Sequence, residues 1–229
     1  MSRRKMSQVT RCDSNDSNLL NFGTFPRPHC ILQVSCAILR KHQMSNSRKK
    51  IELFYDVVSP YTWLAFEVLC RYRKVWNVEL KLRPAYLGGV MLGSGSLTAM
   101  HFITAVAEKE KDSDRLVENV SRELWKRIWS TDQDICEPVS LSEAGLNAGL
   151  SSIEVEELLS LAQSQPIKDK LMQTTQEALD YKAFGFPLIV CHGDGKPQVY
   201  FGSDRFELIA HCIGEKWLGP QPDKPTSHL

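Results

Sequence analysis

The chain has 229 residues, of which 42% are hydrophobic, and its formal net charge is +1. This length is enough for one ordinary core and a second lobe. The charge is uneven, because residues 1–50 hold a net +8 and the remainder a net −7. A mildly acidic body argues against nucleic acid as the main partner. We also expect no membrane span, since the sequence has no apolar run of about 18 residues.

Residues 1–48 differ in composition from the rest of the chain. They mix Ser, Asn, Arg and Lys with little apolar periodicity. We interpret them as an atypical, disordered N-terminal extension, or as a segment used in only one transcript, with Met44 as an alternative start. Their Arg- and Ser-rich, acid-poor composition leaves a mitochondrial transit peptide as the other interpretation.

The cysteines argue against both a disulfide scaffold and a metal centre. No two of them form a C-x-x-C pair, and only Cys191 and His192 offer adjacent metal-type ligands. An odd number of scattered cysteines suits a reducing compartment, and a structural role for each is the simpler interpretation. The seven are Cys12, Cys30, Cys36, Cys70, Cys136, Cys191 and Cys212.

The first structured stretch, residues 51–88, predicts a strand, a helix and a second strand. The apolar run 51–58 predicts a buried strand, and the strict alternation over 78–84 predicts another. The helix between them has an apolar face that includes Leu64. It begins at Ser59-Pro60, where the serine hydroxyl caps a free N–H and the proline occupies the first helical position. Seen alone, Ser59 is an N-cap; the alternative is a hydroxyl at the positive, anion-favouring end of a helix.

The remainder of the chain predicts helices and then strands. Apolar residues recur at helical spacing from about 96 to 182, with aromatic side chains expected in the core. A strand at 186–191, a turn at 193–195, a strand at 198–201 and a helix after Arg205 follow. The order is therefore βαβ, helical insertion, ββα. That is the order of an α/β, thioredoxin-like fold in two parts, 49–91 and 183–219, around an inserted helical domain at 92–182, with a tail at 220–229.

Several motifs in this order resemble the kappa class of glutathione transferases, a DsbA-like branch of the thioredoxin superfamily. The resemblance covers about 51–229. The motifs that carry it are Glu52-Leu53-Phe54-Tyr55-Asp56-Val57 with Ser59-Pro60-Tyr61, Ser121-Arg122-Glu123-Leu124-Trp125 with Arg127 and Trp129, Ala183-Phe184-Gly185-Phe186-Pro187, Phe201-Gly202-Ser203-Asp204-Arg205, and Gly214-Glu215-Lys216-Trp217.

The resemblance implies a glutathione site and no metal. Ser59 would donate a hydrogen bond to the glutathione sulfur, because Ser59-Pro60-Tyr61-Thr62 stands where related oxidoreductases carry C-x-x-C. Phe186-Pro187 matches a cis-proline loop whose backbone pairs with the cysteinyl part of glutathione; an ordinary trans proline is the alternative. Ser203 and Asp204 match residues that hold the γ-glutamyl end, with plain helix capping as the alternative. The predicted glutathione-binding residues are Ser59, Pro60, Tyr61, Phe186, Pro187, Ser203 and Asp204.

The chain departs from the family pattern after Met91. The pattern carries several tens of further residues there, which begin the helical domain and supply an asparagine that contacts glutathione. This chain continues directly with Leu92. The resemblance therefore implies a truncated helical domain, weakened or lost catalysis and an uncertain dimer, whereas the family implies a homodimer.

The leading hypothesis is a detoxifying enzyme that activates the glutathione thiol for conjugation to small electrophiles or for peroxide reduction. The alternatives are a glutathione-dependent isomerase and a non-catalytic binding or chaperone-like protein; a thiol–disulfide oxidoreductase is disfavoured by the missing paired cysteines. The C-terminal Ser227-His228-Leu229 resembles a peroxisomal address, so we expect a peroxisomal location, with the mitochondrion as the alternative.

Overall fold

A computed structural model describes residues 48–89, 95–110, 113–193 and 195–224. Four strands form one mixed sheet in the order β2-β1-β3-β4. Strand β1 (Lys49–Tyr55) runs parallel to β2 (Val78–Pro84) and antiparallel to β3 (Leu188–His192), which pairs antiparallel with β4 (Gln198–Phe201). The order of elements confirms the predicted thioredoxin-like fold.

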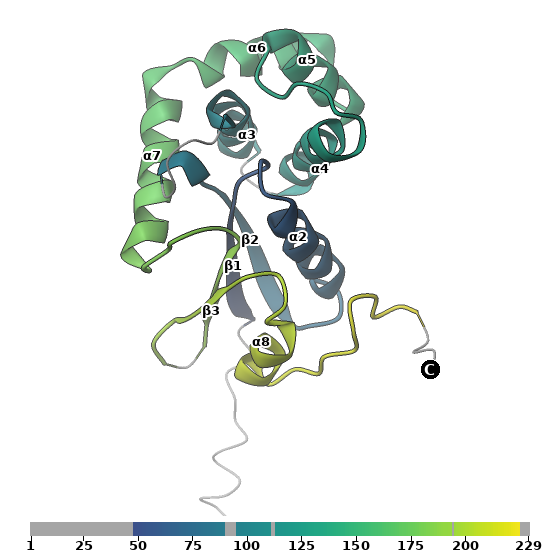
Figure 1. Ribbon diagram of the computed structural model, residues 1–229, viewed down its shortest axis with the longest axis vertical. Helices are drawn as coiled ribbons and strands as arrows, with labels where there is room; N and C mark the ends of the chain where they lie inside the picture. The colour runs from purple at the N-terminus through teal and green to yellow at the C-terminus, as the bar shows by residue number, and fades with distance from the viewer. Residues whose placement is uncertain (1–47, 90–94, 111–112, 194, 225–229) are drawn as a thin grey trace, which may run out of the picture. The chain divides into compact units, whose positions relative to one another are not determined.

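Helices cover both faces of the sheet, which is why β1 is a nearly continuous buried run (Figure 1). On one face Ile51 and Leu53 join the core formed with α2 (Pro60–Tyr72) and α8 (Phe206–Ile213). On the other face Phe54 packs in a smaller cluster that includes Ala178 from α7 (Gln165–Asp180). Alternate residues of one strand thus serve two different cores.

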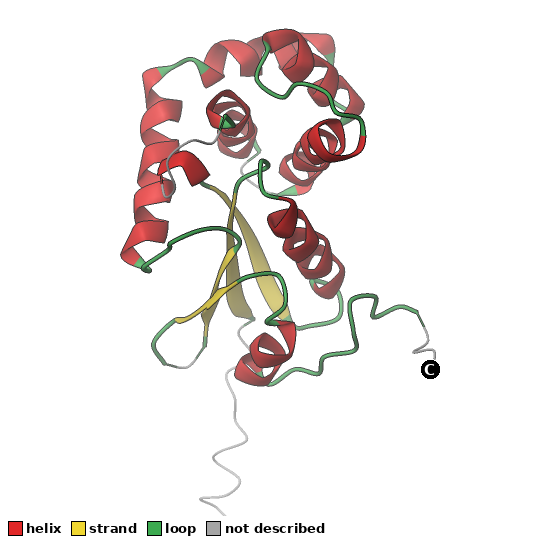
Figure 2. Cartoon of the chain, in the orientation of Figure 1, coloured by secondary structure: helices red, strands yellow, loops and turns green. Residues whose placement is uncertain are grey.

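The helical insertion, which we call the helical lobe, comprises α3 to α7. Helices α3 to α6 lie beyond the end of the sheet at which β1 finishes, and α7 runs back alongside the sheet (Figures 1 and 2). A single-turn helix, η1 (Leu87–Gly89), connects β2 toward the lobe. The helices of the lobe pack on one another, with α3 in contact with α4, α6 and α7. The remaining lobe helices are α3 (Leu97–Lys109), α4 (Arg115–Ser130), α5 (Pro138–Asn147) and α6 (Ser152–Ala162).

Local signals placed several elements correctly. Ser151 and Glu154 form the capping box expected at the start of α6, with each side chain bonded to the other's backbone N–H. Strand β2 alternates between buried and exposed side chains as predicted, and β4 has the predicted bounds. Other expectations were wrong in detail: β1 ends at Tyr55 rather than at residue 58, β3 begins at Leu188 rather than at residue 186, and Leu64 is 59% exposed rather than in the core.

Some predicted features lie outside the described residues. These are the N-terminal extension up to residue 47, the junction between Met91 and Leu92, Asp194 in the β3–β4 turn, and the terminal Ser227-His228-Leu229. Among the residues that are described, no helix is long and apolar enough to cross a membrane.

Candidate active site

Ser59 lies where β1 hands over to α2. The backbone N–H of Ser59 donates to the Asp56 carbonyl at 3.2 Å, which closes the turn after the strand. The Ser59 hydroxyl accepts the Thr62 N–H at 3.3 Å, and Pro60 occupies the first helical position. The prediction of an N-cap at Ser59 is confirmed. Because α2 carries no acidic side chain in its first turn, nothing there offsets the positive end of the helix.

The same hydroxyl faces the loop that precedes β3. Ser59 Oγ lies 3.5 Å from the Phe186 carbonyl oxygen, to which it donates, although the two residues are 127 positions apart in the chain. The Phe186–Pro187 peptide bond is cis, as the sequence predicted. Phe186 buries its ring in the smaller core, and its backbone carbonyl, rather than its side chain, faces Ser59. The structure therefore brings together two of the predicted glutathione contacts.

A side chain of the helical lobe hydrogen bonds to the backbone of Ser59. The indole N–H of Trp125 in α4 donates to the Ser59 carbonyl at 3.2 Å. Trp125 is fully buried among aromatic rings, with its centroid 4.8 Å from that of Phe66 and 6.2 Å from that of Trp63, which stacks parallel to it. Tyr55, also fully buried, hydrogen bonds to Ser121 of the same helix at 2.8 Å. These contacts make the lobe part of the frame that positions Ser59.

Ser203 and Asp204 line a groove of about 560 Å³ between α2 and the start of α8. The cap of α8 is Arg205 without any side-chain cap bond, so the alternative that Ser203 and Asp204 only cap this helix is not supported. The Asp204 carboxylate is 68% exposed and pairs with Arg205 at 3.5 Å. The groove is lined by Trp63, Leu64, Glu67, Val68, Arg71, Ser203, Asp204, Phe206, Glu207, Trp217 and Pro220.

The remaining predicted residues lie at the same end of α2. Pro60 is its first residue, and the Tyr61 side chain is 67% exposed beside it. Leu64, one turn further on, is exposed because it forms part of the groove wall instead of the core. A second, more apolar groove of about 420 Å³ lies between α7 and the start of α3, and none of the predicted site residues lines it.

Comparison with known proteins assigns the family. Residues 50–214 match the model of the DSBA-like thioredoxin domain. Glutathione S-transferase kappa 1 of Rattus norvegicus is 40% identical over 229 residues, which take in 81% of this chain and 100% of the rat protein. The chain belongs to the kappa-class glutathione S-transferases. The human protein of the same name is 39% identical over 224 residues, covering 79% of this chain and 98% of its own length.

A likeness of fold alone extends further. The thiol-disulfide exchange protein alpha-DsbA2 of Wolbachia pipientis superimposes with a TM-score of 0.58 at 14% identity, covering 75% of this chain and 83% of that one. This likeness confirms the DsbA-like fold of the kappa-class chain.

The rat alignment also bears on the length of this kappa-class chain. It extends over 229 residues, whereas 81% of this chain is about 185 residues. About 44 aligned positions therefore have no counterpart in this chain. That difference has the size of the segment predicted to be absent after Met91.

Three cysteines of this kappa-class chain, Cys70, Cys136 and Cys191, carry thiols whose pKa is raised above the ordinary value. Burial raises the pKa of Cys70 to about 11 and that of Cys191 to about 12, far above the range in which a thiol ionises readily. The pKa of Cys136 is also raised, first by burial and then by Asp134 and Glu137. Nor do the described residues contain a group of three or more His, Cys, Asp or Glu side chains that could hold a metal ion.

Sequence reasoning gave no role to two residues that the structure places at the site of this kappa-class chain. Trp125 was expected only to fill the core, and nothing in its helical spacing signals a bond to a carbonyl 66 positions away. Asp56 belongs to a quoted motif, and its place three residues before Ser59, at the end of an apolar strand, was a usable signal. A carboxyl there is buried and must find hydrogen-bond donors.

Proposed function

We propose that this protein is a glutathione transferase in which the Ser59 hydroxyl activates the thiol of bound glutathione. The observation that carries the proposal is the meeting of this hydroxyl with the Phe186 carbonyl at the positive end of α2, in a chain of the kappa class. Since the contact between Ser59 and the carbonyl is long, at 3.5 Å, the hydroxyl can turn to a sulfur atom at little cost.

The available interactions are strong enough for thiol activation. Lowering a thiol pKa from about 8.5 to about 6.5 requires roughly 2.7 kcal/mol of preferential stabilisation of the thiolate. A partly buried helix end supplies up to about 2 kcal/mol, and a hydrogen bond to a charged group supplies about 1.5–3 kcal/mol. The helix end and the Ser59 hydroxyl together reach the required amount, whereas neither does so comfortably alone.

The rest of glutathione is placed by the groove and the cis-proline loop. The cysteinyl backbone pairs with the Phe186 backbone next to Pro187, as an added strand would. The γ-glutamyl end reaches Ser203 and Asp204, where the hydroxyl donates to its carboxylate and the exposed aspartate pairs with its amine. Pro60 and Tyr61 form the edge of the site at the start of α2.

The bound thiolate attacks a small electrophile, or reduces a peroxide, in a detoxifying role. We also propose a homodimer, as implied by the resemblance, and a peroxisomal location directed by Ser227-His228-Leu229, with the mitochondrion as the alternative. Because about 44 positions of the rat protein have no counterpart here, we expect weaker catalysis than in a full-length relative.

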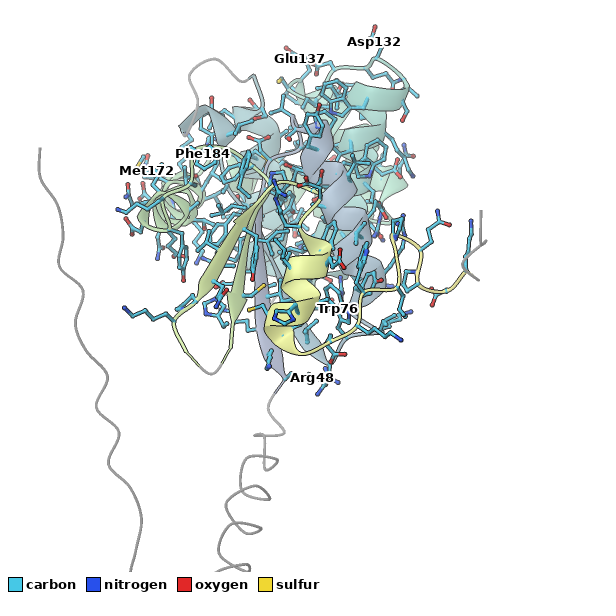
Figure 3. All side chains as sticks on the ribbon, turned by 60° about the horizontal axis from the view of Figure 1, so that its bottom comes forward. Arg48, Trp76, Asp132, Glu137, Met172 and Phe184 are labelled. Carbon is cyan, nitrogen blue, oxygen red and sulfur yellow. The ribbon has the colours of Figure 1, made fainter. Side chains whose placement is uncertain are left out.

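One observation favours a non-catalytic binding protein as the second candidate. The apolar groove between α7 and α3 is lined by Tyr86 and Leu97, which lie on either side of the junction after Met91. Met172 in the same groove is 69% exposed, and Figure 3 shows it at the surface. An exposed apolar groove is one mark of a surface that binds another protein.

Calorimetry of glutathione binding to the full chain, together with the ultraviolet absorbance of the bound thiolate, tests the proposal. We expect Ser59→Ala to lower the thiolate signal near pH 7 severalfold and to leave much of the affinity. Ser203→Ala should weaken binding and leave the pKa of the bound thiol unchanged. Ser160→Ala, on the exposed side of α6, is the control. A folded protein that gives no heat with glutathione would overturn the proposal in favour of the non-catalytic one.

A further inference from the structure

Asp56 is a fully buried acid immediately before the site. Its side chain has no exposed surface, and it follows the last residue of β1. One carboxyl oxygen accepts the Val58 N–H at 3.0 Å, and the other accepts the Leu87 N–H at 2.8 Å and the Ser96 hydroxyl at 2.7 Å. Burial raises the pKa of this carboxyl and the three hydrogen bonds act in the opposite direction.

These three donors belong to three separate parts of the chain. Val58 lies in the turn that delivers Ser59, whose own N–H donates to the Asp56 carbonyl. Leu87 opens the single-turn helix after β2, and Ser96 precedes α3 at the entrance to the helical lobe. A single side chain therefore ties the turn of Ser59 to both sides of the connection between the sheet and the lobe.

The Ser96 hydroxyl bonds to Asp56 instead of capping its own helix. A serine at a helix N-cap usually accepts an N–H from the first turn with its own hydroxyl. Ser96 is the N-cap of α3 but makes no side-chain cap bond. Its hydroxyl, fully buried, donates to Asp56 instead. The start of the lobe is thus hydrogen bonded to the start of the site.

We propose that Asp56 is the positioning residue for Ser59, and that through it the helical lobe sets the geometry of the hydroxyl. The inference rests on the proposed function for the part that concerns glutathione. It assigns no contact between Asp56 and substrate, since the carboxyl is enclosed by protein atoms. It goes beyond a role in folding because the same carboxyl shapes the turn on which Ser59 is carried.

The hydrogen-bonding pattern requires a carboxyl group and excludes an amide of the same shape. Backbone N–H groups can only donate, and they approach both oxygens of Asp56. In Asp56→Asn one of these positions holds an NH₂ group, so a donor would face a donor at either Val58 or Leu87. The isosteric change should therefore disrupt the turn instead of conserving it.

The test compares Ser96→Ala and Asp56→Asn with Ser140→Ala in the full chain. Ser140 is the matched control, because it is also a buried serine of the lobe and its hydroxyl accepts from Arg127 at 3.2 Å. We expect amide hydrogen exchange at Val58 and Leu87 to be about tenfold faster in the first two variants than in the control, as loss of a hydrogen bond to a charged group implies. This readout requires no glutathione.

The second readout is the ionisation of bound glutathione. In Ser96→Ala we expect the thiolate fraction at pH 7 to fall about threefold while the glutathione affinity changes less than about twofold, an effect that general destabilisation would not produce. Exchange rates equal to those of Ser140→Ala would overturn the inference. The inference would also be overturned if Ser96→Ala exchanged faster but left the pKa of the bound thiol unchanged, while Ser59→Ala did change that pKa. Failure of the wild-type chain to bind glutathione would overturn the proposed function alone, because the exchange rates would still decide whether Asp56 couples the turn to the lobe.

Discussion

Replacing Trp125 by Phe tests whether the helical lobe positions Ser59. The change removes the indole N–H that donates to the Ser59 carbonyl at 3.2 Å. That carbonyl is not left without a donor, because it also accepts the Trp63 N–H at 3.3 Å. The substitution therefore loosens Ser59 without orphaning a buried carbonyl.

The expected cost of Trp125→Phe follows from its contacts. The lost hydrogen bond contributes about 0.5–1.5 kcal/mol to stability. Phenylalanine is smaller by roughly 40 Å³, and at about 24 cal/mol per Å³ of cavity this adds about 1 kcal/mol. We expect urea unfolding to show a loss of about 1.5–2.5 kcal/mol. The pKa of bound glutathione should rise by at most about 0.7 unit, which is the equivalent of about 1 kcal/mol.

Trp76→Phe is the matched control. Trp76 is 2% exposed, and its indole N–H donates to the Lys216 carbonyl at 3.0 Å. Trp76→Phe therefore removes the same kind of hydrogen bond and the same side-chain volume as Trp125→Phe. It lies near α8 and the C-terminal segment (Figure 3), where it contacts Tyr72 and Trp217. Both variants should lose similar stability, but only Trp125→Phe should alter the thiol pKa. Equal effects of the two variants on thiol ionisation would refute the reasoning.

Three further predictions concern the core charge, the cysteines and the chain end. Burial alone would raise the pKa of Glu52, but Lys50, Arg83 and His192 outweigh it and lower the pKa from its ordinary value of 4.5. The ionised Glu52 therefore stabilises the folded protein above pH 4.5, and this stabilisation is lost as the pH falls through the folded-state pKa. Glu52→Gln should thus cost about 2 kcal/mol at pH 7 in urea unfolding and progressively less in acid, and a pH-independent difference would contradict this. The purified protein should not reduce insulin disulfides without glutathione, because the sequence has no C-x-x-C pair and burial raises the pKa of the Cys70 and Cys191 thiols; measurable turnover would show an exchange-active cysteine. Deleting Leu229 should move the protein out of peroxisomes in fluorescence imaging, and an unchanged location would disprove that address.

Local patterns predicted those parts of the fold that depend on neighbours in sequence. The alternation from Val78 to Pro84 matches β2, and Ser151 with Glu154 forms the expected capping box. The cap at Ser59 is confirmed for the same reason, whereas the cis bond before Pro187, also confirmed, was implied by the family resemblance and not by a local pattern.

Tertiary contacts explain where the sequence fell short. The apolar run suggested a strand to residue 58, but β1 ends at Tyr55 because Asp56 uses both its carbonyl and its carboxyl to form the turn to Ser59. Leu64 matches an apolar helix face, yet its neighbours form a groove instead of a core. Trp129 is 48% exposed, although aromatic residues of the insertion were expected to be buried. Helical spacing identifies a face of a helix, but not what packs against it.

Thiol activation and enclosure of the substrate depend on different parts of this molecule. The contacts that orient Ser59 come from Thr62, Phe186, Trp125 and Asp56, and all of them lie in the described residues. The apolar groove beside the junction after Met91 is lined by other residues, from α7 and the start of α3. A missing segment at that junction would therefore leave this groove uncovered, whereas the hydrogen bonds of Ser59 to Thr62, Phe186 and Trp125 do not involve the groove. We accordingly expect this chain to retain an activated glutathione thiol even where its turnover of electrophiles is low, provided that Leu87 and Ser96, on either side of the junction, keep their hydrogen bonds to Asp56.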